Sequence, residues 1–420
     1  VADGSLTRYS DSLPKPKGKV SQWGLFKGIV KPIDEDFLEY IDDVRETLAR
    51  AFKKNDSSLT SEQLTEVTQK TVDRLVFIRF LEDKLIEPEY YISELGAKGN
   101  IWKEFITLCK KLDAKYNGIV FKETTIDKQD FQGPELIEFR KICEDISHLN
   151  SPYDFHYIPI HILGSIYERF LGKIVTLKGR GIKIEEKPEV RKAGGVYYTP
   201  KYIVDYIVKN TVGKLIDGKT PDEISRLRFA DIACGSGSFL IGVYDYLLEY
   251  HKTYYQENHK KAEKDGCINV NGLMTLSLRQ KQDILLNNIY GVDIDHQAVE
   301  VTQFSLALKM LEDETTFTAR QMHIEFRKKI IPEGLGKNII CGNSLIGTDI
   351  LEGKIFPSEE EHKLNPMDYD KRFSEIIKSG GFDAIVGNPP YVNLVSIPEI
   401  ERKYFQKHYK TCKNKSDLYS

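Results

Sequence analysis

The sequence predicts an α/β domain with a mostly parallel sheet, preceded by an all-α domain. Before residue 172, apolar residues recur at three- and four-residue steps, which is typical of amphipathic helices. After residue 192, short β-rich runs alternate with helical stretches, as in a parallel sheet with crossover helices. We therefore divide the 420 residues into an arm or linker (1–33), a helical domain (34–172), a Lys-, Gly- and Glu-rich connector (173–192) and an α/β domain (193–420).

The composition is that of an ordinary globular protein, with 40% hydrophobic and 29% charged residues. The net charge of −3 neither supports nor excludes a nucleic-acid partner, since basic residues can gather in one cleft. Six widely spaced cysteines without CxxC, and nine histidines without a ligand pattern, predict a reducing compartment and no metal site. We find no bilayer-length apolar run and no leader, so we expect a cytoplasmic protein without a membrane partner. Because the chain begins with Val1 instead of Met, we expect a trimmed end or a fragment.

The helical domain begins with a clear amphipathic pattern. Thr60 and Gln63 form a capping box ahead of a second helix. Further helical patterns cover 102–112, 135–146 and 160–171, and we interpret the domain as a scaffold. The apolar face of the first helix consists of Phe37, Ile41, Val44, Leu48 and Phe52.

Four strands are predicted in the α/β domain, at 229–232, 289–293, 338–341 and 383–386. Their carboxyl ends should meet at one edge, and open α/β sheets bind ligands outside that edge. A motif follows each strand there.

The first motif, 229–239, combines a strand end with a glycine turn. Gly235 and Gly237 allow the main chain to pass close to a ligand. Leu240 replaces the last glycine of GxGxxG, which argues against a dinucleotide pyrophosphate. Asp231 at the strand end suits a cationic group.

The second motif, 290–295, places acidic residues at a strand tip. Asp293 can accept hydrogen bonds from two ribose hydroxyls, and Ile294 can pack on an adenine face. Alternatively, Asp293 and Asp295 both cap the following helix. Alternation along the strand favours Asp293 as the ligand and Asp295 as the cap.

The third motif, 339–345, ends at Asn343, whose amide oxygen could accept from an adenine amino group. Taken alone, Gly342 and Asn343 are better explained as a turn.

The fourth motif, 382–391, ends in Asn388, Pro389, Pro390 and Tyr391. Two prolines stiffen the segment and remove N–H donors. The side-chain oxygen of Asn388 and the main-chain oxygen of Pro389 can both accept from one planar amino group, which makes its nitrogen nucleophilic. Tyr391 can stack on an unpaired base. A plain loop is the alternative, and we favour the functional interpretation.

A fifth motif, 194–200, predicts a helix start with Thr199 as N-cap and Pro200 at the first helical position. Thr199 either holds a ligand carboxylate at the helix N-terminus or only caps the helix.

Together, the motifs resemble the gamma class of N6-adenine DNA methyltransferases of restriction–modification systems. Fused type IIG enzymes are the nearest likeness and type I modification subunits the next. The likeness spans about residues 37–420 and includes 75–83, 163–171 and 415–419. It implies a Rossmann-like S-adenosylmethionine-dependent methyltransferase fold, S-adenosylmethionine as cofactor, and methylation of a flipped-out adenine in double-stranded DNA.

The resemblance also implies roles for residues. In the family, an Asp usually stands where this chain has Asn343, against the adenine amino group. The candidate catalytic residues are Asn388, Pro389, Pro390 and Tyr391. The candidate cofactor-binding residues are Tyr197, Thr199, Asp231, Ala233, Gly235, Gly237, Asp293, Ile294, Asn343 and Ser344.

Family members continue past the point where this chain stops, so we expect an incomplete catalytic domain, with a nuclease and a target-recognition domain or subunit as partners. The final basic stretch either binds DNA phosphates or is a solvated helix face. It consists of Arg402, Lys403, Lys407, Lys410, Lys413 and Lys415.

Three rival functions remain open. One is methylation of a protein glutamine, whose carboxamide also suits the fourth motif. Another is a non-catalytic scaffold that binds S-adenosylmethionine. The last is methylation of cytosine N4, which usually has Ser in place of Asn388.

Overall fold

The structure is a computed structural model. The residues it describes are 33–116, 120–155, 158, 160, 173–178, 181–186, 199–270, 272–314, 330–352, 364–394 and 397–412. The predicted arm (1–33, apart from its last residue) and almost all of the predicted helix at 160–171 therefore lie outside the described residues.

The chain divides into two compact units. The first, here called the helical unit, comprises Val1–Lys111, Glu123–Ile162 and Ile174–Glu185. The second, here called the sheet unit, comprises Leu112–Lys122, Leu163–Lys173 and Glu186–Ser420.

The helical unit packs amphipathic helices around an aromatic core. Phe37, Ile41, Val44, Leu48 and Phe52 are all buried, which confirms the predicted face of the first helix. The Thr60–Gln63 capping box is also confirmed. The helices are α3 (Ile33–Asn55), α4 (Ser61–Asp83), α5 (Ile101–Tyr116), the short η1 (Thr125–Lys128) and α6 (Pro134–Ile146).

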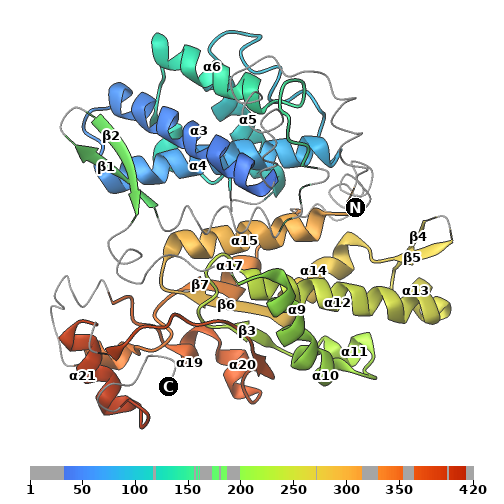
Figure 1. Cartoon of the computed structure of the whole chain (residues 1–420). Helices are drawn as coiled ribbons and strands as arrows, with labels where there is room; N and C mark the ends of the chain where they lie inside the picture. Colours follow the sequence, from blue (N-terminus) through green and yellow to red (C-terminus); the bar gives the residue numbers. More distant parts are fainter. Residues whose placement is uncertain are drawn as a thin grey trace, which may run out of the picture. The chain divides into compact units, whose positions relative to one another are not determined.

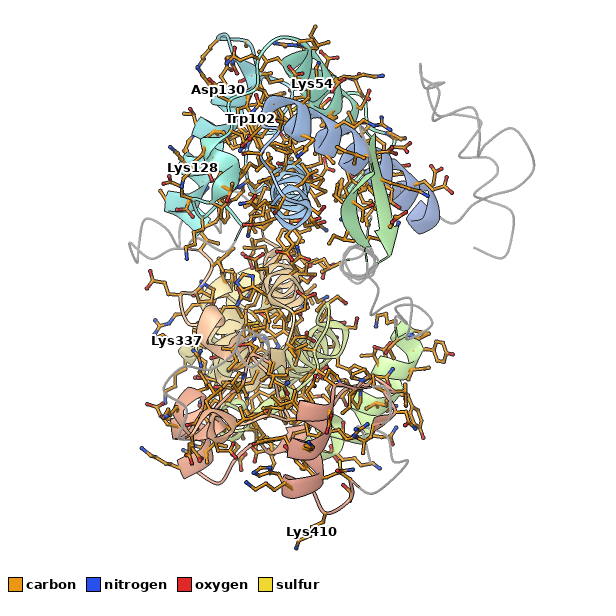
Figure 2. All side chains as sticks on the ribbon, turned by 90° about the vertical axis from the view of Figure 1, so that its left-hand side faces the viewer. Lys54, Trp102, Lys128, Asp130, Lys337 and Lys410 are labelled. Carbon is orange, nitrogen blue, oxygen red and sulfur yellow. The ribbon has the colours of Figure 1, made fainter. Side chains whose placement is uncertain are left out.

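Trp102, labelled in Figure 2, is buried in this aromatic core. Its ring centroid is 4.3 Å from that of Phe131, 4.9 Å from that of Phe139 and 5.6 Å from that of Phe52. Its indole N–H donates to the Gln129 carbonyl at 2.7 Å. A buried indole therefore keeps its hydrogen bond while its ring fills the core.

The interval expected to be a connector contains two strands. These are β1 (Lys173–Lys178) and β2 (Gly181–Glu186), which form a two-stranded sheet. Val175 is buried, and its N–H donates to the Thr65 hydroxyl on α4 at 3.0 Å. The polar composition suggested a linker, but β-branched residues such as Val175 and Thr176 favour a strand.

The sheet unit contains a four-stranded parallel sheet in the order β7-β6-β3-β8, and Figure 1 labels β7, β6 and β3. The strands are β3 (Phe229–Asp231), β6 (Ile289–Asp293), β7 (Ile339–Cys341) and β8 (Ala384–Ile385), and every neighbouring pair is parallel. The four predicted strands and the parallel sheet are confirmed. The chain runs outward from β3 to β6 and β7 and then crosses to β8 on the other side of β3. The strand order therefore reverses between β3 and β8.

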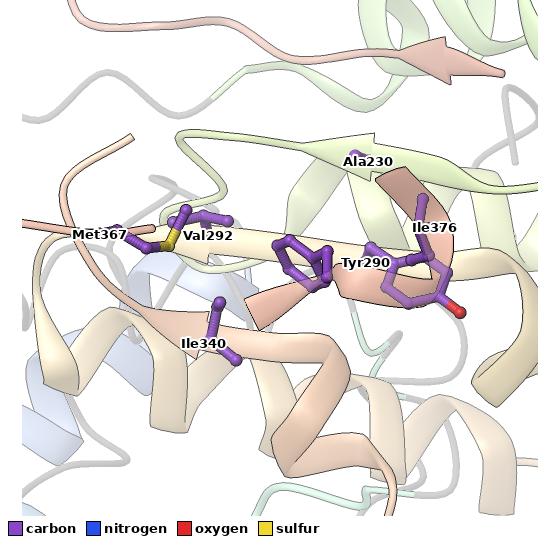
Figure 3. Close-up of a cluster of buried hydrophobic side chains, with 7 residues drawn as sticks. Ala230, Tyr290, Val292, Ile340, Met367 and Ile376 are labelled. Atoms are coloured by element: carbon purple, nitrogen blue, oxygen red, sulfur yellow. The ribbon is translucent and has the colours of Figure 1, made fainter. Parts of the chain in front are cut away.

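One face of this sheet is apolar (Figure 3). Ala230, Tyr290, Val292 and Ile340 share this face, because they alternate with residues pointing the other way. Met367, Phe373 and Ile376, from the segment around α19 (Tyr369–Arg372) and α20 (Ser374–Lys378), cover it.

The opposite face packs against α12 (Ser238–Glu257) and α15 (His296–Leu311). At Gly291, an added Cβ would lie 2.7 Å from Leu240 Cδ1 and 3.2 Å from Ile339 Cδ1. Glycine therefore lets α12 approach the middle of the sheet.

The remaining elements of the sheet unit are short or peripheral. These elements are α9 (Lys201–Asn210), α10 (Val212–Ile216), α11 (Pro221–Ile224), α13 (His259–Lys264), the β4–β5 hairpin (Ile268–Val270 and Leu273–Thr275), α14 (Leu278–Asn288), α17 (Leu335–Asn338), η2 (Thr348–Leu351) and α21 (Glu399–His408).

None of the helices within the described ranges is long and apolar enough to cross a membrane.

Candidate functional site

The loop after β3 has the backbone that its glycines predict. Gly235 and Gly237 have φ angles of +52° and +87°, in the left-handed region where glycine is favoured. The Gly235 N–H donates to Asp293 Oδ2 at 2.9 Å, and its carbonyl accepts from the Thr302 hydroxyl at 2.8 Å. The first and second motifs are therefore joined directly.

Asp231 is a buried carboxylate at the carboxyl end of β3. Only 3% of it is exposed, and Oδ1 accepts from the Ala233 N–H at 3.0 Å. Burial raises the pKa of Asp231 to about 7; the nearby charge of Asp293 adds to this, and the Ala233 N–H opposes it.

Asp293 lies at the carboxyl end of β6, next to Asp231 in the order of strands. Its Oδ1 accepts from the Asp295 N–H at 2.9 Å, and burial raises its pKa. In the part of the chain that the structure describes, neither Asp231 nor Asp293 has an ion-pair partner. Two carboxylates with backbone donors but no cation suit a positively charged ligand.

The fourth motif begins beside Asp231. The Val386 N–H donates to the Ala230 carbonyl at 2.9 Å, which continues the pairing of β8 with β3. A Cβ added to Gly387 would lie 2.6 Å from Asp231 Oδ1 and 3.0 Å from its Cγ. The main chain immediately before Asn388 therefore lies against the Asp231 carboxylate.

Asn388 is exposed, and both ends of its carboxamide are hydrogen-bonded. Its Nδ2 donates to Thr199 Oγ1 at 3.2 Å, and its Oδ1 accepts from the Tyr391 hydroxyl at 2.8 Å. Pro389 and Pro390 are exposed, and Tyr391 is 72% exposed. The structure therefore brings residues of the fourth and fifth motifs together.

Thr199 does not cap α9 as predicted. The helix begins at Lys201, its N-cap position is Pro200, and no side chain makes a cap hydrogen bond. The helix starts one residue later than the Thr-Pro pattern predicts, so the half-buried Thr199 precedes the cap and its oxygen bonds Asn388 instead. Tyr197 lies outside the described residues.

Asn343 forms a turn in this structure. Its side-chain oxygen accepts from the N–H groups of Leu345 at 2.9 Å and Ile346 at 3.1 Å. A carbonyl oxygen has two lone pairs, and both now serve the loop. The structure thus shows the turn that the Gly-Asn pattern favours, and the acceptor role toward an adenine amino group stays a prediction. The Ser344 hydroxyl donates to the Ile232 carbonyl and ties this loop to the end of β3.

The tip of β6 carries two aspartates, and the ligand role of Asp293 stays a prediction. Asp295 caps α15 by accepting from the Gln297 N–H at 2.9 Å, which confirms its interpretation as the cap. Ile294, between the two aspartates, is 54% exposed. An exposed apolar side chain beside Asp293 offers a surface to the flat face of a ligand ring.

The basic stretch begins on α21, which contacts the loop after β7. Asp349 accepts from the Tyr404 hydroxyl at 2.6 Å and lies 3.0 Å from His408 Nε2. The Tyr409 hydroxyl donates to the Leu345 carbonyl at 2.8 Å. Sequence reasoning missed this contact, because its polar residues lie in no motif.

The basic side chains differ in exposure. Lys403, Lys407 and Lys410 are exposed, and Arg402 is half-buried. Lys403 pairs with Glu399 at 2.6 Å, and Figure 2 labels Lys410. The remaining two, Lys413 and Lys415, lie outside the described residues.

The fold and the site together indicate a class of protein, namely α/β proteins that bind a nucleotide-type cofactor. A parallel α/β sheet with a glycine loop and acidic strand tips at its carboxyl edge is typical of nucleotide-type cofactor binding. The family model for N-6 DNA methylase matches residues 159–323, and that for the Eco57I restriction-modification methylase matches residues 287–420. Over these two regions the chain is similar to N6-adenine DNA methyltransferases of restriction–modification systems.

Two curated relatives are similar to most of this chain. The type II restriction enzyme and methyltransferase RM.Eco57I of Escherichia coli is 33% identical over 391 residues, covering 92% of this chain and 37% of that protein. The putative type II restriction enzyme and methyltransferase RM.MjaORFECS2P of Methanocaldococcus jannaschii is 26% identical over 342 residues, covering 66% of this chain and 27% of that protein. The chain thus spans only about a third of the length of these relatives.

A solved structure shares the fold. The type IIL restriction-modification enzyme MmeI, in complex with DNA, aligns with a TM-score of 0.54 at 17% identity. The alignment covers 93% of this chain and 48% of that one.

Proposed function

We propose that this chain transfers a methyl group from S-adenosylmethionine to N6 of a flipped-out adenine in double-stranded DNA. One observation carries the proposal: Asn388 follows Gly387, whose main chain lies against the buried Asp231 carboxylate. A carboxylate suited to a cationic donor and an amide that can hold an amino group are thus neighbours. They meet where the strand order reverses, which is where open α/β sheets bind ligands. The sheet unit is, on this proposal, a Rossmann-like methyltransferase domain.

The residues of the first two motifs fit S-adenosylmethionine. Asp231 would accept from the methionyl ammonium, Asp293 would accept from the ribose hydroxyls, and Ile294 would cover one adenine face. Gly235 and Gly237, with Ala233 before them, allow the ligand to approach the main chain. Bound here, the cofactor supplies an electrophilic methyl group and the positive charge that the two carboxylates lack.

The fourth motif fits the target adenine. Asn388 Oδ1 and the Pro389 carbonyl would accept from its amino group, Pro390 would stiffen the segment, and Tyr391 would stack on the ring. The Tyr391 hydroxyl already donates to Asn388 Oδ1 at 2.8 Å, so this oxygen is placed to accept from a donor. Most of the rate enhancement would come from holding the amino group in line with the methyl group.

DNA would be bound by more than the target base. The exposed lysines of the basic stretch, among them Lys403 and Lys407 on α21, would contact phosphates. We also propose a nuclease and a target-recognition domain or subunit as partners, because the chain matches part of a relative named restriction enzyme and methyltransferase.

Transfer of tritiated methyl groups to random-sequence duplex DNA tests the proposal, with N6-methyladenine identified by mass spectrometry. We expect Asn388→Ala to lower the rate by about a hundredfold or more, because it removes an acceptor that acts in the transition state. Asn210→Ala is the matched control, since Asn210 is an exposed residue on α9 whose amide bonds only the Tyr206 carbonyl among its described contacts.

The rival functions give different results in the same assay. Equal DNA methylation by the wild-type chain and Asn388→Ala, or none by either, would favour a scaffold. Label appearing in a protein glutamine and not in DNA would favour the protein methyltransferase.

A further inference from the structure

The two ends of a carboxamide have the same shape but opposite hydrogen-bonding character. If Asn388 holds the target amino group, its oxygen must face that group, because its NH2 end would oppose a second donor. A rotation of about 180° about the last side-chain bond exchanges the two ends. The proposed function therefore requires something that selects one orientation.

Packing does not select it, because Asn388 is exposed. In the structure, hydrogen bonds hold one orientation, with Nδ2 donating to Thr199 Oγ1 and Oδ1 accepting from the Tyr391 hydroxyl. An incoming amino group can donate to Oδ1 either beside the Tyr391 hydroxyl or in its place, because a carbonyl oxygen has two lone pairs. The bond to Thr199 uses the other end of the carboxamide, so it can persist while the base is bound.

Thr199 stands just before a fixed helix. Val204 and Val208 of α9 are buried, and a Cβ added to Gly242 on α12 would lie 2.5 Å from Val204 Cγ1. This close approach anchors the first turn of α9 against α12. Thr199 is thus attached to a packed element, whereas Asn388 lies on an exposed segment.

We infer that Thr199 is a positioning residue for methyl transfer, whose hydroxyl oxygen accepts from Asn388 Nδ2 and so presents Asn388 Oδ1 to the target amino group. The inference rests on the proposed function and adds a role to the cofactor contact predicted for Thr199. A hydroxyl can accept one hydrogen bond while donating another, so both roles are compatible. They differ in kinetics, because a cofactor contact lowers KM while positioning raises kcat.

Three variants of the chain test the inference. Thr199→Val keeps the shape and removes the acceptor, while Thr199→Ser keeps the acceptor. Thr211→Val is the matched control, since the Thr211 hydroxyl bonds the Ile207 carbonyl at 2.7 Å at the other end of α9. At saturating S-adenosylmethionine, we expect Thr199→Val to lower kcat by about tenfold to a hundredfold. We expect Thr199→Ser to restore kcat to within about threefold of wild type.

A second readout needs no activity. In chains labelled with nitrogen-15 at asparagine, the Asn388 side-chain NH2 signals are those missing from Asn388→Asp. We expect Thr199→Val to move these signals toward the positions of solvent-exposed amides, with Thr199→Ser and Thr211→Val leaving them near the wild-type positions. The other asparagine signals report whether each variant is folded.

The outcomes separate the inference from the proposed function. Asn388 signals that do not move in folded Thr199→Val would overturn the inference, whether or not the chain methylates DNA. So would a loss confined to the KM for S-adenosylmethionine, with kcat intact. Absence of methyl transfer by the wild-type chain would contradict the proposed function alone, and the NMR result would still decide the Thr199–Asn388 contact.

Discussion

One buried carboxylate from each unit of this protein shows two different ways of holding a buried charge. In the helical unit, the Arg74 guanidinium meets the Asp127 carboxylate twice, at 3.0 and 2.9 Å, and their side chains are 0% and 2% exposed. In the sheet unit, Asp231 is 3% exposed, yet its described partners are one backbone N–H and the like charge of Asp293. Asp127 has its cationic partner, Arg74, within the fold. Asp231 has no such partner among the described residues, so it can still attract a cation.

A raised pKa alone does not separate the two regions. Burial raises the pKa of Glu82 in the helical unit to about 7, as it does that of Asp231. Glu82, however, also has the positive charge of Arg79 nearby and accepts from the Ile92 N–H at 2.8 Å. The neighbours of a buried carboxyl group, and not its pKa, distinguish a scaffold from a binding site.

The largest expected effect is on stability, from breaking the pair in the helical unit. Asp127→Ala leaves Arg74 buried without its carboxylate, so we expect the free energy of unfolding of this unit to fall by about 3–5 kcal/mol. Arg74→Met combined with Asp127→Ala should recover much of the loss. Urea denaturation followed by circular dichroism measures both. If Asp127→Ala stays as stable as wild type but stops methylating DNA, the helical unit is more than a scaffold.

The next effect is on the contact between the Gly387 main chain and the Asp231 carboxylate. Gly387→Ala places a Cβ 2.6 Å from Asp231 Oδ1, so either the carboxylate or the segment carrying Asn388 must move. We expect the rate of methyl transfer to fall by about a hundredfold. Gly336→Ala is the control, because the nearest atom to its Cβ would be Gln303 Nε2 at 4.0 Å. Equal rates for the two variants would mean that this contact is unimportant.

A smaller effect should appear in the pH dependence. The pKa of Asp231 is raised from 3.8 to about 7, so the folded chain binds more protons than the unfolded chain between these values. The contribution of Asp231 to the free energy of unfolding should therefore decrease as pH rises from about 4 to about 7, and then level off.

Cofactor affinity should change in the opposite direction. A cationic cofactor prefers the ionised carboxylate, so affinity should rise by up to about tenfold per pH unit below 7. Calorimetry across this range measures the trend, and Asp231→Asn should flatten it. An affinity that falls with rising pH would contradict the assignment.

The sequence predicted features that depend on neighbouring residues. The four strands, the capping box at Thr60 and the role of Asp295 as a helix cap all follow from local patterns. The turn at Gly235 was predictable for the same reason, because a positive φ angle is favoured by glycine itself and not by distant contacts.

Contacts between distant segments were not predictable in the same way. Thr199 and Asn388 are 189 positions apart, and no spacing rule relates them. The sequence shows that residue 387 is a glycine. It does not show that the main chain of Gly387 approaches Asp231, because that contact depends on the pairing of β8 with β3. For Asn343, the family resemblance suggested a ligand role, whereas the local Gly-Asn turn pattern agreed with the structure.

Titration of S-adenosylmethionine into the chain by calorimetry tests the central claim most directly, namely that the carboxylates at the sheet edge bind a cationic donor. Above the pKa of Asp231, we predict saturable one-to-one binding to the wild-type chain. Asp231→Asn keeps the shape but removes the charge, and we predict that it binds about tenfold more weakly. Failure of the wild-type chain to bind, or equal affinity in Asp231→Asn, would contradict the account.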